Sequence, residues 1–167
     1  YDTVGDVPEA AVPLPFGKAA VVRQGKDITI VATSYMSYEA LHAAEELESN
    51  GISAEVVDLR SIRPLDEETI LASVKKTGRL IAADTSWELC GIASEVAALV
   101  AEKGFSYLKA PVRRIALANC PAPVSHSLEK VFYPSANTIA KAAMVMLGKD
   151  DGSLGHIDQA DTFKGPY

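Results

Sequence analysis

Positive charge is scarce in this chain, and cysteine is scarcer still. Sixteen lysines and arginines face 22 acidic residues, for a net charge of −6. Because a nucleic-acid surface needs clustered lysine and arginine, we expect no nucleic-acid partner. The two cysteines, Cys90 and Cys120, lack the spacing of metal ligands. We therefore expect buried core thiols in a reducing, cytoplasmic compartment.

Long apolar runs are missing as well. No stretch approaches the roughly 18 uncharged apolar residues of a membrane span, and nothing resembles a signal peptide, so we expect no membrane association. Yet 48% of the 167 residues are apolar, which is enough for one domain with a real core.

Short apolar runs alternate with segments of helical period. The runs at residues 19–23, 28–33, 54–59, 79–84 and 112–117 are typical of strands. The turn sequence QGKD between the first two predicts a hairpin. Segments of helical period separate the later runs, and another follows the last of them. The pattern predicts a three-layer α/β/α fold around a mixed, mostly parallel, five-stranded sheet.

The segment DLRSIRPLDEETI contains the clearest local signals. Asp66 stands at a helix N-cap, two acidic residues follow it, and two lysines precede Gly78 near the end of the helix. Ligands of such sheets lie beyond the carboxyl ends of the strands, where Arg60 and Arg63 are expected. These arginines can bind a phosphate or a carboxylate. The simpler alternative is that they pair with Asp58, Asp66 or a neighbouring domain.

Other candidates for chemistry are weak. His126 lies in an expected loop between two serines, but no nucleophile elbow precedes either serine. We interpret it as a loop or interface histidine, and His42 as a surface residue of a helix. One glycine before the helix at LCGIASE is too little for a dinucleotide fingerprint. The residues therefore predict no catalytic, cofactor-binding or metal-ligating group in this chain.

Several ordered motifs carry a family resemblance. They are PFGKAAVVRQGKDITIVATSYMSYEALHAAEELESNGISAEVVDLRSIRPLDEETI, YLKAPVRRIAL and PAPVSHSLEKVFYPSA. Together with the closing helix they resemble the C-terminal domain of transketolase-like enzymes over roughly residues 8–148. Within that superfamily the chain is most similar to the beta subunit of thiamine-diphosphate-dependent 2-oxoacid dehydrogenases of the pyruvate, branched-chain or acetoin type.

The resemblance implies a division of the chain and a role for its main domain. Residues 1–17 become a linker from a pyrimidine-binding domain, residues 18–148 the transketolase C-terminal-like domain, and residues 149–167 an acidic flexible tail. Thiamine diphosphate and Mg²⁺ would lie in other domains of the full enzyme, with none bound by this fragment. The expected partners are the alpha subunit, a second beta subunit in a heterotetramer, and the lipoyl acyltransferase core.

The resemblance also implies which residues meet partners. Arg60 and Arg63 would hold domains together, and His126 would lie at an interface. Relatives have an acid in a Leu-Asp-Ala-Pro motif that helps to hold the basic binding domain of the acyltransferase, and Lys109 stands in its place here. Two alternatives stay open. One is the same domain of another enzyme, such as a split sugar transketolase, and the other is a free-standing regulatory module that binds a small anion.

Overall fold

The computed structural model describes residue 9 and residues 13–149 of the chain. The predicted linker at residues 1–17 and the predicted tail at residues 149–167 therefore lie mostly outside the described residues. The strands are β1 (Ala20–Arg23), β2 (Ile28–Ala32), β3 (Ala54–Asp58), β4 (Leu80–Trp87) and β5 (Arg113–Leu117). The helices are α1 (Tyr35–Ser49), α2 (Glu67–Thr77), α3 (Ile92–Lys103), α4 (His126–Phe132), α5 (Ala136–Met146) and a 3-10 turn, η1 (Phe105–Tyr107).

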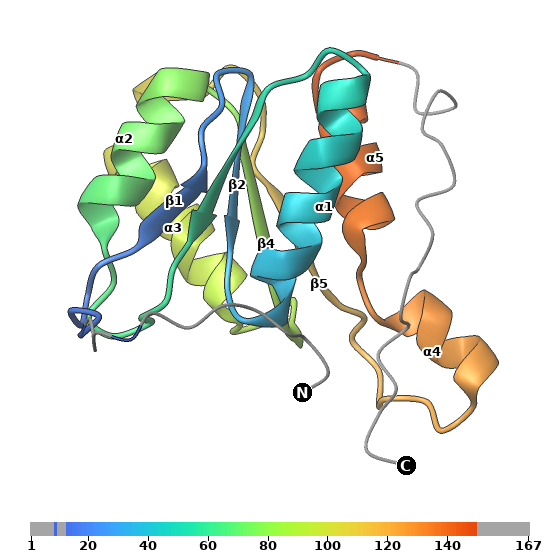
Figure 1. Cartoon of the computed structure of the whole chain (residues 1–167). Helices are drawn as coiled ribbons and strands as arrows, with labels where there is room; N and C mark the ends of the chain where they lie inside the picture. Colours follow the sequence, from blue (N-terminus) through green and yellow to red (C-terminus); the bar gives the residue numbers. More distant parts are fainter. Residues whose placement is uncertain (1–8, 10–12, 150–167) are drawn as a thin grey trace.

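One mixed sheet organises the domain (Figure 1). Its strand order is β1-β3-β2-β4-β5, with β2 to β5 parallel and β1 antiparallel to β3. Ile30 sits at the centre, paired with Val56 on one side and Ile81 on the other. Because the loops of a parallel sheet gather at its two ends, the domain has a carboxyl edge and an amino edge. The predicted three-layer, five-stranded fold is confirmed.

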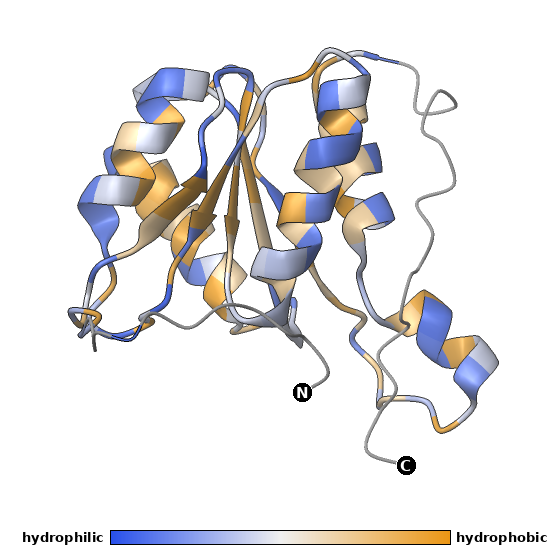
Figure 2. Ribbon diagram, in the orientation of Figure 1, coloured by the Kyte–Doolittle hydropathy of each residue, from blue (hydrophilic) through white to orange (hydrophobic). Residues whose placement is uncertain are grey.

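Two apolar layers sandwich the sheet, as the orange interior of Figure 2 shows. Ile28 and Ile30 of β2 pack towards α1 and α5, whereas Val31 faces α2 and α3 with Val57 of β3. All five residues of β2 are buried. A strand covered on both faces reads as a continuous apolar run, which is why the sequence signal for β2 was strong.

The predicted hairpin between β1 and β2 is wrong. Instead of turning back beside β1, the chain crosses the start of β3, where the N–H groups of Lys26 and Asp27 both donate to the Ser53 carbonyl. Gly25 makes the crossing possible, because a Cβ there would overlap the backbone of Ala54 and Glu55. The four residues of QGKD therefore carry the chain over β3, and β2 pairs on its far side.

Helix α2 follows the predicted signals closely. The side chain of Asp66 accepts the Thr69 N–H at 3.3 Å, and Gly78 ends the helix in the left-handed conformation with φ 76°. Acidic residues occupy the first turn and lysines the last. The N-cap prediction is confirmed. None of the described helices is long and apolar enough to cross a bilayer.

Candidate functional site

Three non-glycine residues at the carboxyl edge have a positive φ. Ser34 after β2, Arg60 after β3 and Cys90 in the β4–α3 loop have φ values of 51°, 53° and 60°. Each left-handed non-glycine residue costs about 1–3 kcal/mol, and such residues concentrate at binding sites and other functional sites. These residues follow three adjacent strands, so the carboxyl edge is the candidate functional site.

Apolar side chains are exposed at the same edge. Trp87 at the end of β4 is 56% exposed, and Phe16, before β1, is 91% exposed. Phe16 belongs here because its neighbour Gly17 packs against Pro64 of the β3–α2 loop. We call the exposed apolar side chains beyond the strand ends the carboxyl-edge surface: Leu14, Phe16, Ile62, Trp87, Leu89, Val124, Leu128 and Val131. Exposed apolar groups concentrated like this are typical of protein interfaces.

Arg60 is held by its own loop. Its backbone N–H donates to Asp58 Oδ1 at 3.2 Å, and its Nε lies 3.9 Å from Asp58 Oδ2. Asp58 also accepts the Ser37 hydroxyl at 3.0 Å. The predicted pairing of an arginine with Asp58 is therefore confirmed for Arg60. An arginine engaged in this way shapes the edge and is less free to bind a small anion.

Arg63 is placed differently. It is exposed, follows the exposed Ile62, and makes no ion pair with any residue that the structure describes. The Ser61 hydroxyl donates to the Pro64 carbonyl at 3.0 Å, which closes the loop around it. Arg63 thus offers an uncommitted charge at the carboxyl edge.

His126 was expected in a loop, and this is wrong: it is the first residue of α4. The missed signal was Ser125 at the N-cap, followed by Leu128 and Phe132 at a spacing of four. Of α4, only Phe132 is buried, and the helix stands apart from the sheet in Figure 1. His126 is 68% exposed, with its Nδ1 3.3 Å from Glu129 Oε2. No group of three metal-ligating side chains occurs among the described residues.

Both cysteines were expected in the core, and this is also wrong. Cys90 and Cys120 are exposed. Each lies in a loop that follows a strand, Cys90 after β4 and Cys120 after β5, so neither belongs to a buried face of a regular element. Cys90 moreover adopts the left-handed conformation just before α3.

Lys109 lies at the opposite end of the sheet. Its backbone N–H donates to the Gly78 carbonyl at 2.7 Å, and Gly78 lies just before the start of β4. Its side-chain methylenes cover Gly78, where a Cβ would come within 2.7–2.9 Å of them. Of the four predicted interface residues, Arg60, Arg63 and His126 thus share the carboxyl edge, while Lys109 stands alone at the amino edge.

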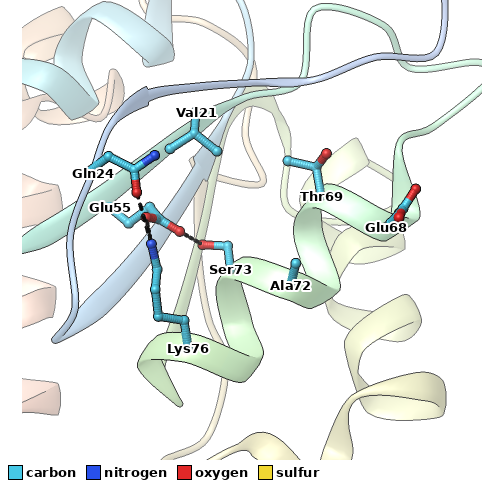
Figure 3. Close-up of a pocket in the computed structure, with 8 residues that line it drawn as sticks. All are labelled: Val21, Gln24, Glu55, Glu68, Thr69, Ala72, Ser73 and Lys76. Carbon is cyan, nitrogen blue, oxygen red and sulfur yellow. Dashed lines mark hydrogen bonds and ion pairs between the residues drawn. The ribbon is translucent and has the colours of Figure 1, made fainter.

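A buried polar network escaped prediction. Glu55 of β3 is 1% exposed and bonds to Lys76, to the Ser73 hydroxyl at 2.6 Å and to the Gly25 N–H at 3.3 Å. Thr29 of β2 contacts the Ser73 hydroxyl at 2.7 Å, which links two strands to α2. An acid inside the otherwise apolar run AEVV was the available signal. Above the network lies a cavity of about 560 Å³ (Figure 3).

The sequence of the chain matches a known protein family. Residues 17–139 match the family described as "Transketolase, C-terminal domain". The chain belongs to the transketolase C-terminal domain family. This domain is 46% identical over 143 residues to the acetoin:2,6-dichlorophenolindophenol oxidoreductase subunit beta of Cupriavidus necator, covering 86% of the chain and 42% of the relative. It is 51% identical over 130 residues to the pyruvate dehydrogenase E1 component subunit beta-1, mitochondrial, of Arabidopsis thaliana, covering 78% and 36%.

The predicted resemblance is therefore confirmed, and relatives of this transketolase C-terminal domain include beta subunits of pyruvate dehydrogenase and of acetoin oxidoreductase. The chain spans less than half the length of the curated relatives it matches. Among solved structures, the domain resembles "Split gene transketolase, inactive beta4 tetramer" with a TM-score of 0.73 and 30% identity, over 87% of the chain and 46% of that structure. A transketolase mutant of Pichia stipitis, at 19% identity and a TM-score of 0.55, shares the fold.

Proposed function

We propose that this domain is the assembly domain of the beta subunit of a thiamine-diphosphate-dependent 2-oxoacid dehydrogenase. The full enzyme would decarboxylate a 2-oxoacid such as pyruvate oxidatively and transfer the acyl group to lipoamide. The observation that carries the proposal is identity of 46–51% to subunits named for acetoin and pyruvate oxidation. The carboxyl-edge surface supports the assembly role, because it offers apolar area of the kind that subunit interfaces bury.

Thiamine diphosphate and Mg²⁺ fit poorly on this domain itself. Within residues 13–149 no three metal-ligating side chains converge, and Arg60 is engaged by Asp58. We therefore assign the cofactor to the rest of the enzyme and derive no chemical step from residues of this chain. Its own residues would contribute contacts to the alpha subunit and to a second beta subunit, through the carboxyl-edge surface and Arg63.

Docking of the lipoyl acyltransferase core is part of the same proposal, as are the division into linker, domain and tail and a cytoplasmic location. The names of the Arabidopsis thaliana and Pisum sativum relatives carry the word mitochondrial, so the compartment differs among relatives. Lys109 would weaken this docking at its own position, because a lysine in place of an acid repels the basic binding domain of the acyltransferase.

A second candidate is the same domain of a split transketolase, favoured by the TM-score of 0.73 to a split-gene beta tetramer. Its 30% identity is lower than that of the dehydrogenase beta subunits. The third alternative, a free-standing anion-binding module, is less favoured because one of its two arginines, Arg60, lies beside the Asp58 carboxylate, which competes with an anion.

The test is an activity screen of the full beta subunit with its alpha partner. We expect acyl transfer with pyruvate, a branched 2-oxoacid or acetoin as substrate, and no sugar transketolase activity. Calorimetry of the 167-residue chain with thiamine diphosphate and Mg²⁺ is the companion measurement. Micromolar binding to this chain alone would contradict the division of roles, and transfer of a two-carbon sugar unit would favour the second candidate.

A further inference from the structure

The outer face of helix α1 is exposed and carries two tyrosines. The buried residues of α1, from Met36 to Leu47, pack against the sheet and against α5, which lies beside α1 in Figure 1. At about 100° per residue, the side chains opposite that buried face recur with a spacing of three and four residues. We call them the α1 stripe: Tyr35, Tyr38, His42, Glu45 and Ser49. Tyr38 is 48% exposed, and the side chains of His42 and Glu45 are 43% and 64% exposed.

Ring contacts connect the side chains of the α1 stripe. The centres of the Tyr35 and Tyr38 rings lie 6.0 Å apart, with an angle of 32° between the ring planes. The His42 ring meets the Tyr38 ring edge-on at 4.4 Å between centres, and its Nδ1 lies 3.5 Å from Glu45 Oε2. These contacts restrict the side chains in the free protein, so a partner that binds the stripe has fewer rotamers to immobilise.

The charge of α1 has one sign. Its sequence contains four glutamates and no lysine or arginine. Glu39 accepts the N–H of Ala136 at the start of α5, and the other three glutamates lie in the second half of α1. The C-terminal end of a helix is the negative end of its dipole, so acidic residues there are unfavourable. Helix α2 has the opposite and favourable order, with acidic residues first and lysines last. The charge order of α1 is thus not explained by helix stability, and it favours a cationic partner.

Two cations of the chain offset part of this negative charge at the end of α1. Arg23 Nη2 of β1 lies 2.6 Å from Glu48 Oε2, and Lys149 Nζ donates at 2.9 Å to the carbonyl of Asn50, just beyond the helix. Glu45 is placed differently. Among the described residues it contacts no lysine or arginine, and its nearest basic group is His42. The middle of the α1 stripe therefore presents aromatic rings beside a carboxylate that can accept a further cation.

The spacing of the α1 stripe fits a helical partner. The stripe runs about 21 Å along α1, from Tyr35 to Ser49. Side chains that alternate in steps of three and four are the pattern through which two helices pack along a common seam. A second copy of α1 fits poorly, because each copy brings four glutamates and no lysine or arginine to the seam. Arginine and lysine are the favourable counterparts, since their cationic groups stack on tyrosine rings and pair with carboxylates.

We propose that the α1 stripe binds a basic helix of a partner protein. The helix lies along α1, where its arginine or lysine side chains cover the rings of Tyr35 and Tyr38 at one end and meet Glu45 towards the other. The α1 stripe lies on the opposite face of the sheet from α2 and α3, and it shares no residue with the carboxyl-edge surface. The inference goes beyond the proposed function and holds whether or not that function is correct.

The experiment titrates the 167-residue chain into a fluorescein-labelled, alanine-rich helical peptide of roughly 21 residues, with arginine at the a and d positions of each heptad. Fluorescence anisotropy should show saturable binding that weakens as salt is raised. Glu45→Lys should lower the affinity about tenfold or more. Tyr38→Ala should lower it about fivefold, whereas Tyr38→Phe keeps the ring and should stay within about twofold of wild type. Glu102→Lys, the same charge reversal at an exposed position on α3, is the matched control and should change the affinity less than about twofold.

A second peptide tests whether one face of the partner helix is recognised. It has the same composition, but its arginines are spread around the helix, so its affinity should be about fivefold lower or weaker still. Equal affinity would overturn the proposal, because it shows a general attraction of a polycation to an acidic chain. Absence of binding by the first peptide at millimolar concentration would overturn it as well. So would sedimentation in which the chain dimerises and Tyr38→Ala removes the dimer, since a second copy would then occupy the α1 stripe. Thermal melting of each variant confirms that it is folded.

Discussion

Asp66 joins two parts of the fold through one buried carboxylate, and this makes it the most informative residue to change. Its Oδ2 accepts the Ala19 N–H at 3.0 Å and the Thr69 hydroxyl at 2.9 Å, while Oδ1 accepts the Thr69 N–H at 3.3 Å. Lys18 Nζ lies 3.9 Å away, and the Asp66 side chain is 3% exposed. The carboxylate thus caps α2 and fixes the chain that enters β1.

Asp66→Ala should lower the free energy of unfolding by about 2.5–4 kcal/mol. Loss of the N-cap contributes about 1 kcal/mol. Loss of a charged acceptor that leaves the Ala19 N–H unsatisfied contributes about 1.5–3 kcal/mol. Asp66→Asn keeps an oxygen for the cap and removes only the charge, so its cost should be about 1–2 kcal/mol. Urea unfolding followed by circular dichroism measures both values.

The effect should depend on pH in a defined direction. Burial raises the pKa of Asp66, but hydrogen bonds from the Ala19 N–H and from Thr69, with the charge of Lys18, outweigh it and hold the pKa below 3.8. A lowered pKa means that the ionised form stabilises the fold above the unfolded value and that this stability is lost as pH falls through the folded value. The gap between wild type and Asp66→Asn should therefore be constant near neutral pH and shrink below about pH 4.

The exposed neighbour Glu68 supplies the control. Its carboxylate lies 3.9 Å from Lys18 Nζ and its side chain is 89% exposed, so Glu68→Gln should change stability by less than about 1 kcal/mol. A cost below about 1 kcal/mol for Asp66→Ala, or a gap between wild type and Asp66→Asn that does not change from pH 7 to pH 3, would refute the reasoning.

Four further predictions test other parts of the structure. Glu55→Ala should cost about 2–3 kcal/mol in urea unfolding, because it leaves the half-buried Gly25 N–H and the buried Ser73 hydroxyl without this acceptor. Gly25→Ala should cost at least about 2 kcal/mol, since its Cβ would overlap the backbone at the start of β3; wild-type stability would contradict the crossing. Trp87→Glu in the full beta subunit should shift sedimentation towards smaller species, whereas Val145→Glu, at an exposed apolar position on α5, should leave assembly unchanged. Lys109→Asp should strengthen binding of a basic acyltransferase domain, and deletion of residues 149–167 should weaken it, in titrations at two salt concentrations; unchanged affinities would exclude the charge argument.

The layers of the fold were predictable because buried strands and helix ends have recognisable local sequence patterns. The apolar run of β2, the cap at Asp66 and the glycine at Gly78 each signal their structure within a few residues. The pairing of β1 was not predictable in this way. A turn sequence shows that the chain bends, but only the close approach of Gly25 to β3 shows that it crosses a strand.

The candidate site was predictable in its location and only partly in its composition. Arg60 and Asp58 are two positions apart, so their pairing could be foreseen. The separation of Lys109 from Arg63 could not, because it depends on which end of the sheet each loop occupies. The exposure of Cys90 was missed for a related reason: cysteine is usually buried, but a residue in a loop beyond a strand lies outside the core whatever its type.

The antiparallel direction of β1 gives the domain a polarity along its length. The chain enters at the carboxyl edge, where Gly17 packs on Pro64, and residue 149 lies at the other end, where Lys149 Nζ donates to the Asn50 carbonyl at 2.9 Å. A probe or fused module attached ahead of β1 would therefore stand beside the carboxyl-edge surface, and one attached at residue 149 would stand on the side of the amino edge. Two labels attached at these two positions would therefore report on the carboxyl edge and the amino edge separately.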